Sequence, residues 1–145
     1  MPAVAVLPWD ESGRLLLVRE AQTGLWQTIG GSVEPDEAPL EAAVREAEEE
    51  AGVRVLVTRI RAVVGGPQFR LTYPNGDLVS YVSMVLDARV TAGQPRHDGE
   101  ETSATGWFAL EHLRTLELTP FTVELLAAAE VMAAPAGTGG EQPSR

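Results

Sequence analysis

Apolar and polar stretches alternate along the opening part of the chain in a way that predicts short β-strands. Residues 1–7 and 14–19 are apolar runs, and the turn-forming stretch Asp10-Glu11-Ser12-Gly13 between them predicts a β-hairpin. Residues 25–29 predict a third short strand, which ends at Gly30-Gly31. The chain is therefore expected to open with β-structure.

The pattern changes to helical spacing between residues 38 and 51. Asp36 is the expected N-cap, and Pro39 fits the first turn, where its missing N–H has no partner to lose. Gly52 stands where a left-handed C-terminal cap is wanted. On a helical wheel one narrow arc is apolar and is predicted to face the core; it consists of Leu40, Ala43, Val44, Ala47 and Ala51.

The rest of the chain predicts further strands and then further helix. Strands around one strong helix favour an α/β (α+β) sandwich. The predicted segments are strands at 53–64, 69–73 and 78–90, with the hairpin turn Pro74-Asn75-Gly76-Asp77, then a loop at 91–102, a short apolar segment at Trp107-Phe108, and helices at 110–115 and 119–132.

Length and composition favour a single folded domain. Of the 145 residues, 1–132 are expected to form one domain and the Gly-, Pro- and Ala-rich tail 133–145 to be disordered. The chain lacks cysteine, which excludes disulfides, and its net charge of −10 argues against broad nucleic-acid binding. No apolar stretch approaches the about 20 residues of a membrane helix, and no targeting segment is recognised, so a cytoplasmic protein without membrane contact is expected.

A second arc of the predicted helix carries carboxylates. Glu46, Glu49 and Glu50 have the i, i+3, i+4 relation and share one face, while Glu41 and Glu48 lie on the other flank. Such carboxylates repel one another by roughly a few tenths of a kcal/mol per pair, and divalent cations would turn that repulsion into a binding site. Taken alone, the same spacing is more typical of a solvated acidic face.

The surrounding sequence decides between these two interpretations. Residues 31–53 read GSVEPDEAPLEAAVREAEEEAGV: a Gly, five residues, Glu37, seven residues, then Arg45-Glu46, Glu49-Glu50 and Gly52. The segment closely resembles the Nudix box, with every charged and glycine position filled and Ala47 where the family usually has a larger aliphatic residue. The resemblance implies a Nudix-type α/β/α sandwich with a mixed β-sheet and a central catalytic helix.

The resemblance also implies roles for single residues. It implies that Glu46, Glu49 and Glu50, with the carbonyl of Gly31, bind Mg²⁺, which Mn²⁺ could replace. Glu101, in the acidic loop before Trp107, is expected to supply a further metal ligand or the general base, with Glu100 as the second choice. Glu37 and Arg45 resemble an ion pair that orients loop against helix. The residues implied in catalysis are Glu46, Glu49, Arg45 and Glu101, and those implied as structural support are Glu37, Gly30 and Gly52.

The implied reaction is Mg-dependent hydrolysis of the phosphoanhydride bond in a nucleoside diphosphate linked to another group. Nucleoside triphosphates, ADP-ribose or other sugar nucleotides, and dinucleoside polyphosphates all stay open as the small-molecule substrate. One alternative is a catalytically silent module that senses a nucleotide, and another is an acidic interaction domain. The complete set of box carboxylates argues against both. The oligomeric state stays open, a homodimer included.

The sequence assigns no substrate-binding residue. Arginines on or beside strands could reach phosphates, and aromatic side chains could stack on a base, although each is more often an ordinary surface or core residue. These candidates are Arg14, Arg19, Arg59, Arg61, Arg70, Trp26, Phe69, Tyr73 and Tyr81.

Overall fold

Two apolar runs form the strands at the centre of the molecule. The computed structural model describes residues 1–134, and in it β1 (Pro2–Pro8) and β2 (Leu15–Glu20) are almost wholly buried. Their side chains alternate between two hydrophobic clusters, one on each side, so both faces are covered and the runs are apolar throughout. Val4, Val6, Leu16 and Val18 join one cluster, and Ala5, Leu7, Leu15 and Leu17 join the other.

The strands build a mixed sheet and two smaller antiparallel ones. The largest has the order β4-β1-β8-β5, in which β1 runs parallel to β8 and the other pairs are antiparallel. A second has the order β3-β2-β9, and a third is the β6-β7 hairpin. The bounds are β3 Trp26–Gln27, β4 Ile29–Ser32, β5 Arg54–Val64, β6 Arg70–Thr72, β7 Leu78–Ser80, β8 Val82–Ala92 and β9 Thr102–Phe108.

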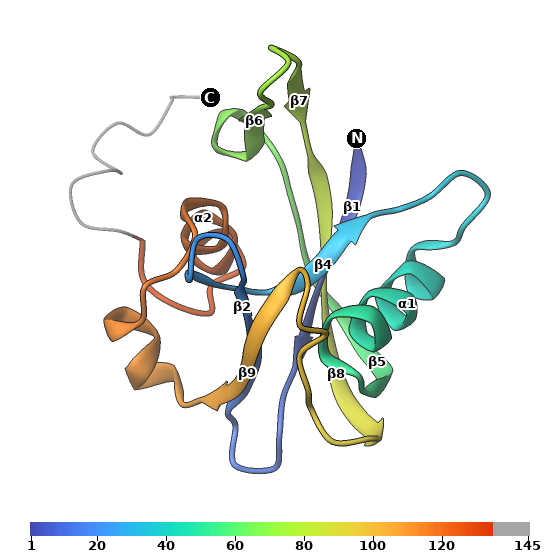
Figure 1. Ribbon diagram of the computed structural model, residues 1–145, viewed down its shortest axis with the longest axis vertical. Coiled ribbons are helices and arrows are strands. Elements are labelled where there is room, and N and C mark those ends of the chain that lie inside the picture. The colour runs from blue at the N-terminus through green and yellow to red at the C-terminus, as the bar shows by residue number, and fades with distance from the viewer. Residues whose placement is uncertain (135–145) are drawn as a thin grey trace.

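Helices cover both sides of these strands. Figure 1 shows α1 (Pro39–Ala51) and α2 (Pro120–Ala128) on opposite sides of the strands. Two 3₁₀ helices, η1 (Pro67–Phe69) and η2 (Leu110–Thr115), lie in the connections. The predicted fold class, a mixed sheet between helices with one central helix, is confirmed.

The predicted hairpin of the first two strands is wrong. β1 already has β4 on one edge and β8 on the other, so its backbone groups are not free to pair with β2. Only the bridge between Trp9 and Leu15 joins the two strands, and β2 pairs with β3 and β9 instead. The turn itself forms, because the Asp10 carboxylate accepts the N–H groups of Ser12 and Arg14 at 2.9 and 2.8 Å.

Two predicted strands are each divided in the structure. The strand expected at 25–29 becomes β3 and β4, and β4 continues through Gly30-Gly31 to Ser32 and does not end there. The strand expected at 78–90 is interrupted at Tyr81, where β7 ends and β8 begins. The predicted turn at 74–77 does join β6 to β7.

The predicted cap of α1 is correct at the C-terminal end and wrong at the N-terminal end. Gly52 has φ 67°, the left-handed conformation predicted for the C-cap. At the other end Asp36 also has φ 67°, so it is not the N-cap. The N-cap is Ala38, whose N–H donates to the Glu41 carboxylate at 2.8 Å, and Pro39 follows in the first turn as predicted.

The buried face of α1 is rotated relative to the prediction. Ala43, Ala47 and Ala51 are buried as expected, but Leu40 is 54% exposed. Ala42 and Glu46 are buried instead, because the helix turns its carboxylate-bearing side toward β4. The face that packs is therefore also the face that carries the chemistry.

The predicted disorder of the C-terminal tail is not tested by the structure. Residues 135–145 lie outside the described residues, so the predicted disorder of that segment stays a prediction. Among residues 1–134, no helix is long and apolar enough to cross a membrane.

Candidate active site

Gly30 and Gly31 bring the backbone of β4 close to two neighbours at once. A side chain at Gly30 would place its Cβ 2.3 Å from the carbonyl oxygen of Val4 on β1. A Cβ at Gly31 would lie 2.2 Å from Oε2 of Glu46 on α1. Both distances are shorter than any real contact of a Cβ atom. At Gly30 the obstacle is backbone, so only glycine fits there, and at Gly31 the absence of a side chain leaves room for the Glu46 carboxylate against the strand.

Glu46 and Glu50 form a close pair of carboxylates beside this strand. Glu46 is only 9% exposed, and the Gly30 N–H donates to Oε1 of Glu50 at 3.3 Å. Burial raises the pKa of Glu46. Burial, followed by repulsion from Glu46, raises the pKa of Glu50 to about 9. Two neighbouring carboxylates that cannot both be ionised share a proton, or they bind a cation in its place.

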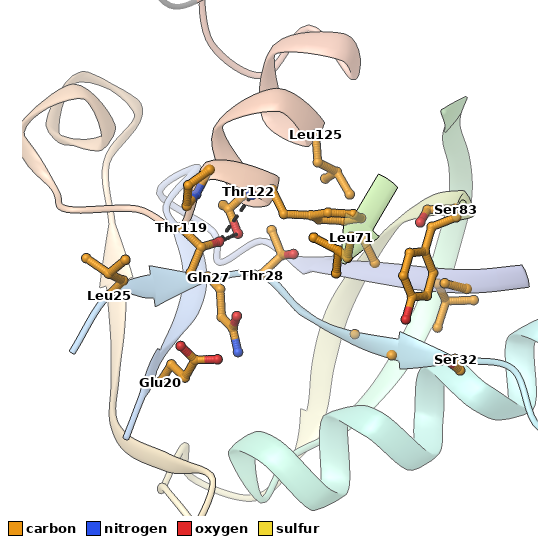
Figure 2. Close-up of a pocket in the computed structure, with 18 of the residues that line it drawn as sticks. Glu20, Leu25, Gln27, Thr28, Ser32, Leu71, Ser83, Thr119, Thr122 and Leu125 are labelled. Atoms are coloured by element: carbon orange, nitrogen blue, oxygen red, sulfur yellow. Dashed lines mark hydrogen bonds between the residues drawn. The ribbon is translucent and has the colours of Figure 1, made fainter. Parts of the chain in front are cut away.

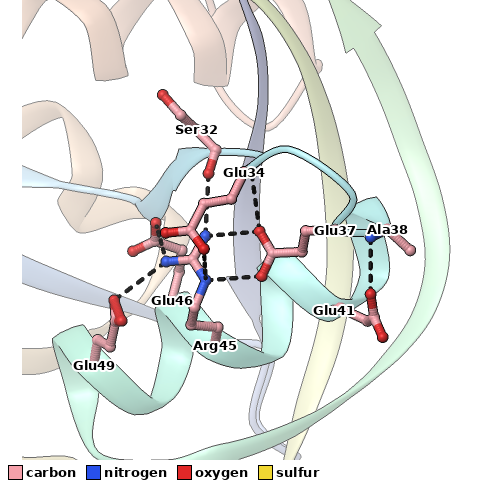
Figure 3. A network of polar contacts seen from close by, with 8 residues as sticks. All are labelled: Ser32, Glu34, Glu37, Ala38, Glu41, Arg45, Glu46 and Glu49. Atoms are coloured by element: carbon pink, nitrogen blue, oxygen red, sulfur yellow. Dashed lines mark hydrogen bonds and ion pairs between the residues drawn. The ribbon is translucent and has the colours of Figure 1, made fainter.

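Arg45 contacts three carboxylates, those of Glu37, Glu46 and Glu49 (Figure 3). Its Nε and Nη2 donate to the two oxygens of Glu37 at 2.8 and 2.9 Å, a bidentate pair. Nη2 also donates to the Ser32 carbonyl at 3.1 Å, which ties β4 to the helix. The hydrogen bonds from Arg45 lower the pKa of Glu37 to about 2, so that carboxylate stays ionised.

Glu49 lies next to the pair but is turned away from it. Arg45 Nη1 donates to Glu46 at 3.1 Å and to Glu49 at 3.3 Å, so the guanidinium stands between these two carboxylates. The Glu49 side chain is 58% exposed. Within residues 1–134, no three acidic or histidine side chains converge as a ready-made metal site. The structure thus brings together two of the three predicted ligands, and it turns the third, Glu49, toward Arg45 and solvent.

The predicted acidic loop lies at the C-terminal end of α1. The Thr102 hydroxyl donates to the Glu50 carbonyl at 3.2 Å, and Thr102 directly follows Glu101. The Glu101 charge is close enough to contribute to the raised pKa of Glu50. Glu101 therefore lies on a loop that contacts the last turn of α1, and its predicted role as metal ligand or base stays a prediction. The Glu100 N–H donates to Asp98 at 2.8 Å.

The chemistry of this donor set fits a hard divalent cation. Two carboxylates from successive turns of α1 lie against the backbone of Gly30 and Gly31, and Mg²⁺ prefers such oxygen ligands. Burial penalises their negative charge, and a cation would remove that penalty. Glu49 is exposed, and among residues 1–134 its hydrogen-bond partner is Arg45.

A cavity of about 460 Å³ opens on the other side of β4 (Figure 2). Its floor includes Gly30, Gly31 and Ser32, so one short strand separates it from the carboxylates. The walls are mainly apolar, with a few polar groups among them. The lining includes residues of β1, β2, β3, β4, β6, β8 and α2, and the polar side chains in it include Glu20, Gln27, Thr28, Ser83 and Thr119.

Of the four aromatic residues that could stack on a base, one lines the cavity. Tyr81 lines the cavity, and its ring packs edge-to-face on Phe121 with a centroid distance of 6.0 Å. Phe69 is buried behind Phe121 at 5.3 Å. Trp26 packs against Phe108 at 4.9 Å, and the hydroxyl of Tyr73 contacts that of Tyr81. Tyr81 is therefore the candidate that faces the cavity.

None of the predicted arginines lines this cavity within the described residues. Arg14 pairs with Asp10, and both Arg59 and Arg61 pair with Asp87. Arg19 donates to the Ser103 hydroxyl at 3.0 Å. These side chains serve local structure, since each has its partner elsewhere.

Phe121, which is not among the residues predicted from the sequence, lines the cavity from the first turn of α2. The signal was present in Thr119-Pro120-Phe121. Thr119 is the N-cap, its side chain accepting the Thr122 N–H at 3.2 Å, and Pro120 opens the helix. Such a start fixes the direction of Phe121, but it does not reveal which strand the helix faces.

Comparison with known proteins identifies the family of the chain. Residues 1–129 match the NUDIX domain family. The chain therefore belongs to the Nudix family and is a hydrolase that acts on acid anhydrides. The resemblance predicted from the box is confirmed.

Two relatives are similar to this chain over most of its length. A MutT-like protein of Streptomyces ambofaciens is 31% identical over 126 residues, which cover 87% of this chain and 75% of the relative. A putative 8-oxo-dGTP diphosphatase of Bacillus subtilis is 32% identical, and the match covers 70% of this chain and 62% of that protein.

Solved structures have the same fold. A MutT Nudix hydrolase from Burkholderia pseudomallei has a TM-score of 0.69 at 29% identity, covering 88% of this chain and 95% of that one. An ADP-ribose pyrophosphatase from Streptococcus suis also has a TM-score of 0.69, at 26% identity, with coverages of 91% and 86%.

Proposed function

We propose that this chain hydrolyses a nucleoside triphosphate or a related nucleoside diphosphate derivative at the Glu46–Glu50 pair, with Mg²⁺ bound. The observation that carries the proposal is the pair formed by buried Glu46 and half-buried Glu50, which rests on Gly30 and Gly31, one strand away from a cavity. Glu46, Glu49 and Glu50, with the carbonyl of Gly31, are the proposed ligands. Mn²⁺ would replace Mg²⁺, because carboxylate and carbonyl oxygens suit both.

The cation contributes what carboxylates alone lack. When bound, it lowers the pKa of a coordinated water and stabilises negative charge on phosphate oxygens. The protein supplies geometry: the Gly30 N–H orients Glu50, and Arg45 fixes the loop that carries Glu37 against α1. Residues that hold the ligands by hydrogen bonds in this way set the positions of the ligands around the cation.

Glu101 is the proposed acceptor of the proton from the attacking water. It stands on the loop that contacts the last turn of α1, beside the carboxylate pair. Its side chain is exposed and has no hydrogen-bond partner among the described contacts of residues 1–134, so it is free to accept a proton. A base has to reach the reacting water directly, and this loop gives Glu101 that access.

The nucleoside portion of the substrate is proposed to occupy the cavity beside β4. A volume of about 460 Å³ is in the range of small-molecule sites, and mainly apolar walls suit a base. Tyr81 and Phe121 offer aromatic faces, and Gln27 and Thr28 offer hydrogen-bonding groups. A nucleoside triphosphatase NudI of Enterobacter, 30% identical over 102 residues, supports triphosphates as the first class to test.

The test is a hydrolysis assay on a panel of substrates with Mg²⁺. The panel contains the nucleoside triphosphates, ADP-ribose and a dinucleoside polyphosphate, and the products are separated by ion-exchange chromatography. Wild-type enzyme is expected to release a nucleoside monophosphate and pyrophosphate from a triphosphate. Glu46→Gln is expected to reduce the rate by at least about 10²-fold, since it removes a charge from the cation site.

Glu48→Gln is the matched control for this experiment. Glu48 lies on the same helix, is exposed and pairs with Arg54 at 2.8 Å, away from the carboxylate pair. It should keep wild-type activity. Equal activity of Glu46→Gln and wild type would contradict the proposed site, and nucleotide binding without any turnover would identify a sensor module instead.

A further inference from the structure

The loop before β9 is folded around one carboxylate. Oδ1 of Asp98 accepts three successive backbone N–H groups, those of Glu100 at 2.8 Å, Glu101 at 2.9 Å and Thr102 at 3.0 Å. Gly99, with φ +81°, allows the chain to turn inside this loop. The backbone at Glu101 is therefore fixed by a side chain three residues earlier.

Thr102 fastens the same loop to the catalytic helix. It is 1% exposed, and its hydroxyl donates to the Glu50 carbonyl at 3.2 Å while accepting the Asp98 N–H at 3.1 Å. The partner of Thr102 is thus the backbone of a proposed metal ligand. The carbonyl groups in the last turn of a helix have no partner within the helix, and this hydroxyl satisfies one of them.

Backbone contacts hold the loop on both sides. The Ala21 N–H donates to the Glu101 carbonyl at 2.9 Å, next to the end of β2. The Arg96 N–H donates to the Ala51 carbonyl at 2.9 Å, at the end of α1. Figure 1 shows the segment between β8 and β9 passing beside that end of the helix. Glu101 is held between α1 and β2.

The acidic charge of the loop explains why it needs the hydrogen bonds of Asp98 and Thr102. Asp98, Glu100 and Glu101 place three acidic side chains beside the last turn of α1, which carries Glu50. Like charges repel one another, so without these hydrogen bonds the loop would move away from the end of the helix. The hydrogen bonds of Asp98 and Thr102 oppose that movement.

We propose that Asp98 and Thr102 are positioning residues that hold the Glu101 carboxylate at the Glu46–Glu50 pair. This inference rests on the proposed function, because it needs Glu101 to act on the substrate water. Neither residue touches substrate. Each acts through the backbone of Glu101, and their effect on catalysis disappears when Glu101 has no role to play.

The test combines loop variants with Glu101→Gln and measures kcat and KM for a triphosphate. Asp98→Ala and Thr102→Val should each lower kcat about tenfold with KM little changed, since displacing a reacting group by about 1 Å costs one to two orders of magnitude. Asp98→Asn and Thr102→Ser keep the accepting oxygen and the hydroxyl, so both should retain most of the wild-type kcat. Glu101→Gln alone should lower kcat about 10²-fold.

The double variant Asp98→Ala/Glu101→Gln separates positioning from general damage. It should have the kcat of Glu101→Gln, because a misplaced base and an absent base are the same defect. A full tenfold further loss in the Glu101→Gln background would overturn the inference. So would wild-type kcat in Asp98→Ala, or an unchanged kcat in Glu101→Gln, and the Glu46→Gln assay would still decide on the proposed function independently.

Asp10→Ala is the matched control for loss of a loop-capping carboxylate. Asp10 accepts the N–H groups of Ser12 and Arg14 at 2.9 and 2.8 Å in the turn between β1 and β2. Its removal should lower the melting temperature as Asp98→Ala does, but leave kcat and KM at wild-type values. A similar kcat loss in Asp10→Ala would show that Asp98 acts only through stability.

Discussion

Two buried carboxylate sites in this molecule have opposite surroundings. Asp87, 5% exposed in the middle of β8, accepts hydrogen bonds from Trp9 at 2.8 Å, Arg59 at 2.6 Å and Arg61 at 2.9 Å. Burial by itself would raise the pKa of Asp87, but the hydrogen bonds from these three side chains outweigh it and lower the pKa. The Arg61 guanidinium also lies 5.6 Å from the centre of the Trp9 ring.

The pair at Glu46 and Glu50 has an excess of negative charge. One guanidinium, that of Arg45, is shared among Glu37, Glu46 and Glu49, and the Glu50 carboxylate has only the Gly30 N–H at 3.3 Å. Burial and mutual repulsion raise the pKa of Glu50 to about 9. A carboxylate with all its partners supports structure, and carboxylates short of partners are ready to bind a cation.

The largest effect should follow from changing the partner-poor site. Glu50→Gln should lower kcat/KM by at least about 10²-fold, because it removes negative charge from the proposed metal site. The same change should leave the free energy of unfolding of the metal-free protein equal or higher at pH 8, because it relieves repulsion with Glu46. Steady-state kinetics and urea unfolding of one preparation check both. A loss of stability together with activity would make the pair structural.

Asp87→Asn should show the reverse pattern. It removes the charge that Arg59 and Arg61 share, so the free energy of unfolding should fall by about 2 kcal/mol, the scale of hydrogen bonds to a charged group. The kcat/KM value should stay within about twofold of wild type. Urea unfolding and the hydrolysis assay measure these quantities, and a large kcat loss in the folded variant would connect this cluster to the reaction.

The two sites should also impose opposite pH dependences on stability. The pKa of Asp87 is lowered by folding, so its contribution is present above its unfolded pKa and is lost as pH falls through the folded one. The pKa of Glu50 is raised to about 9, so the metal-free protein should lose stability as pH rises from about 4.5 toward 9. Thermal unfolding from pH 3 to 9 tests both slopes. Asp87→Asn should flatten the acid side, and Glu50→Gln the alkaline side.

The smallest effect should come from a carboxylate of α1 that belongs to neither site. Glu41 accepts the Ala38 N–H at 2.8 Å at the start of the helix. Glu41→Ala should lower the free energy of unfolding by about 0.5 kcal/mol, as expected for half of a capping box. Activity should not change. A fall in kcat here would mean that the start of α1 takes part in the site.

The sequence was sufficient for the parts of the molecule that depend on local chemistry. The box residues predicted the helix at 38–51, the left-handed cap at Gly52 and the pairing of Glu37 with Arg45, since each depends on spacing along one segment. The approach of Glu101 to the end of α1 also followed from the resemblance. The fold class, which was predicted with the help of the same resemblance, was also correct.

Features that depend on tertiary partners were not accessible in this way. β1 pairs with β8 and not with β2, so the predicted hairpin does not form. The sequence of a local turn does not reveal that a strand distant in the chain occupies the edge of β1. Periodicity predicts that Leu40 belongs to the core, because it lies in the apolar arc of the helix. Periodicity does not show how far the helix rotates to bury Glu46, and this rotation leaves Leu40 exposed. Phe121 and the shape of the cavity depend on where α2 packs, which no motif encodes.

Isothermal titration calorimetry of Mn²⁺ binding, without substrate, measures whether Glu46 and Glu50 hold a divalent cation. Wild type and Glu48→Gln should bind Mn²⁺ with the same dissociation constant, because Glu48 lies outside the carboxylate pair. Glu46→Gln should bind it at least about tenfold more weakly, since the loss of one ligand costs a large part of the affinity for a metal. Equal affinities of Glu46→Gln and wild type would contradict the claim that Glu46 and Glu50 hold the catalytic cation.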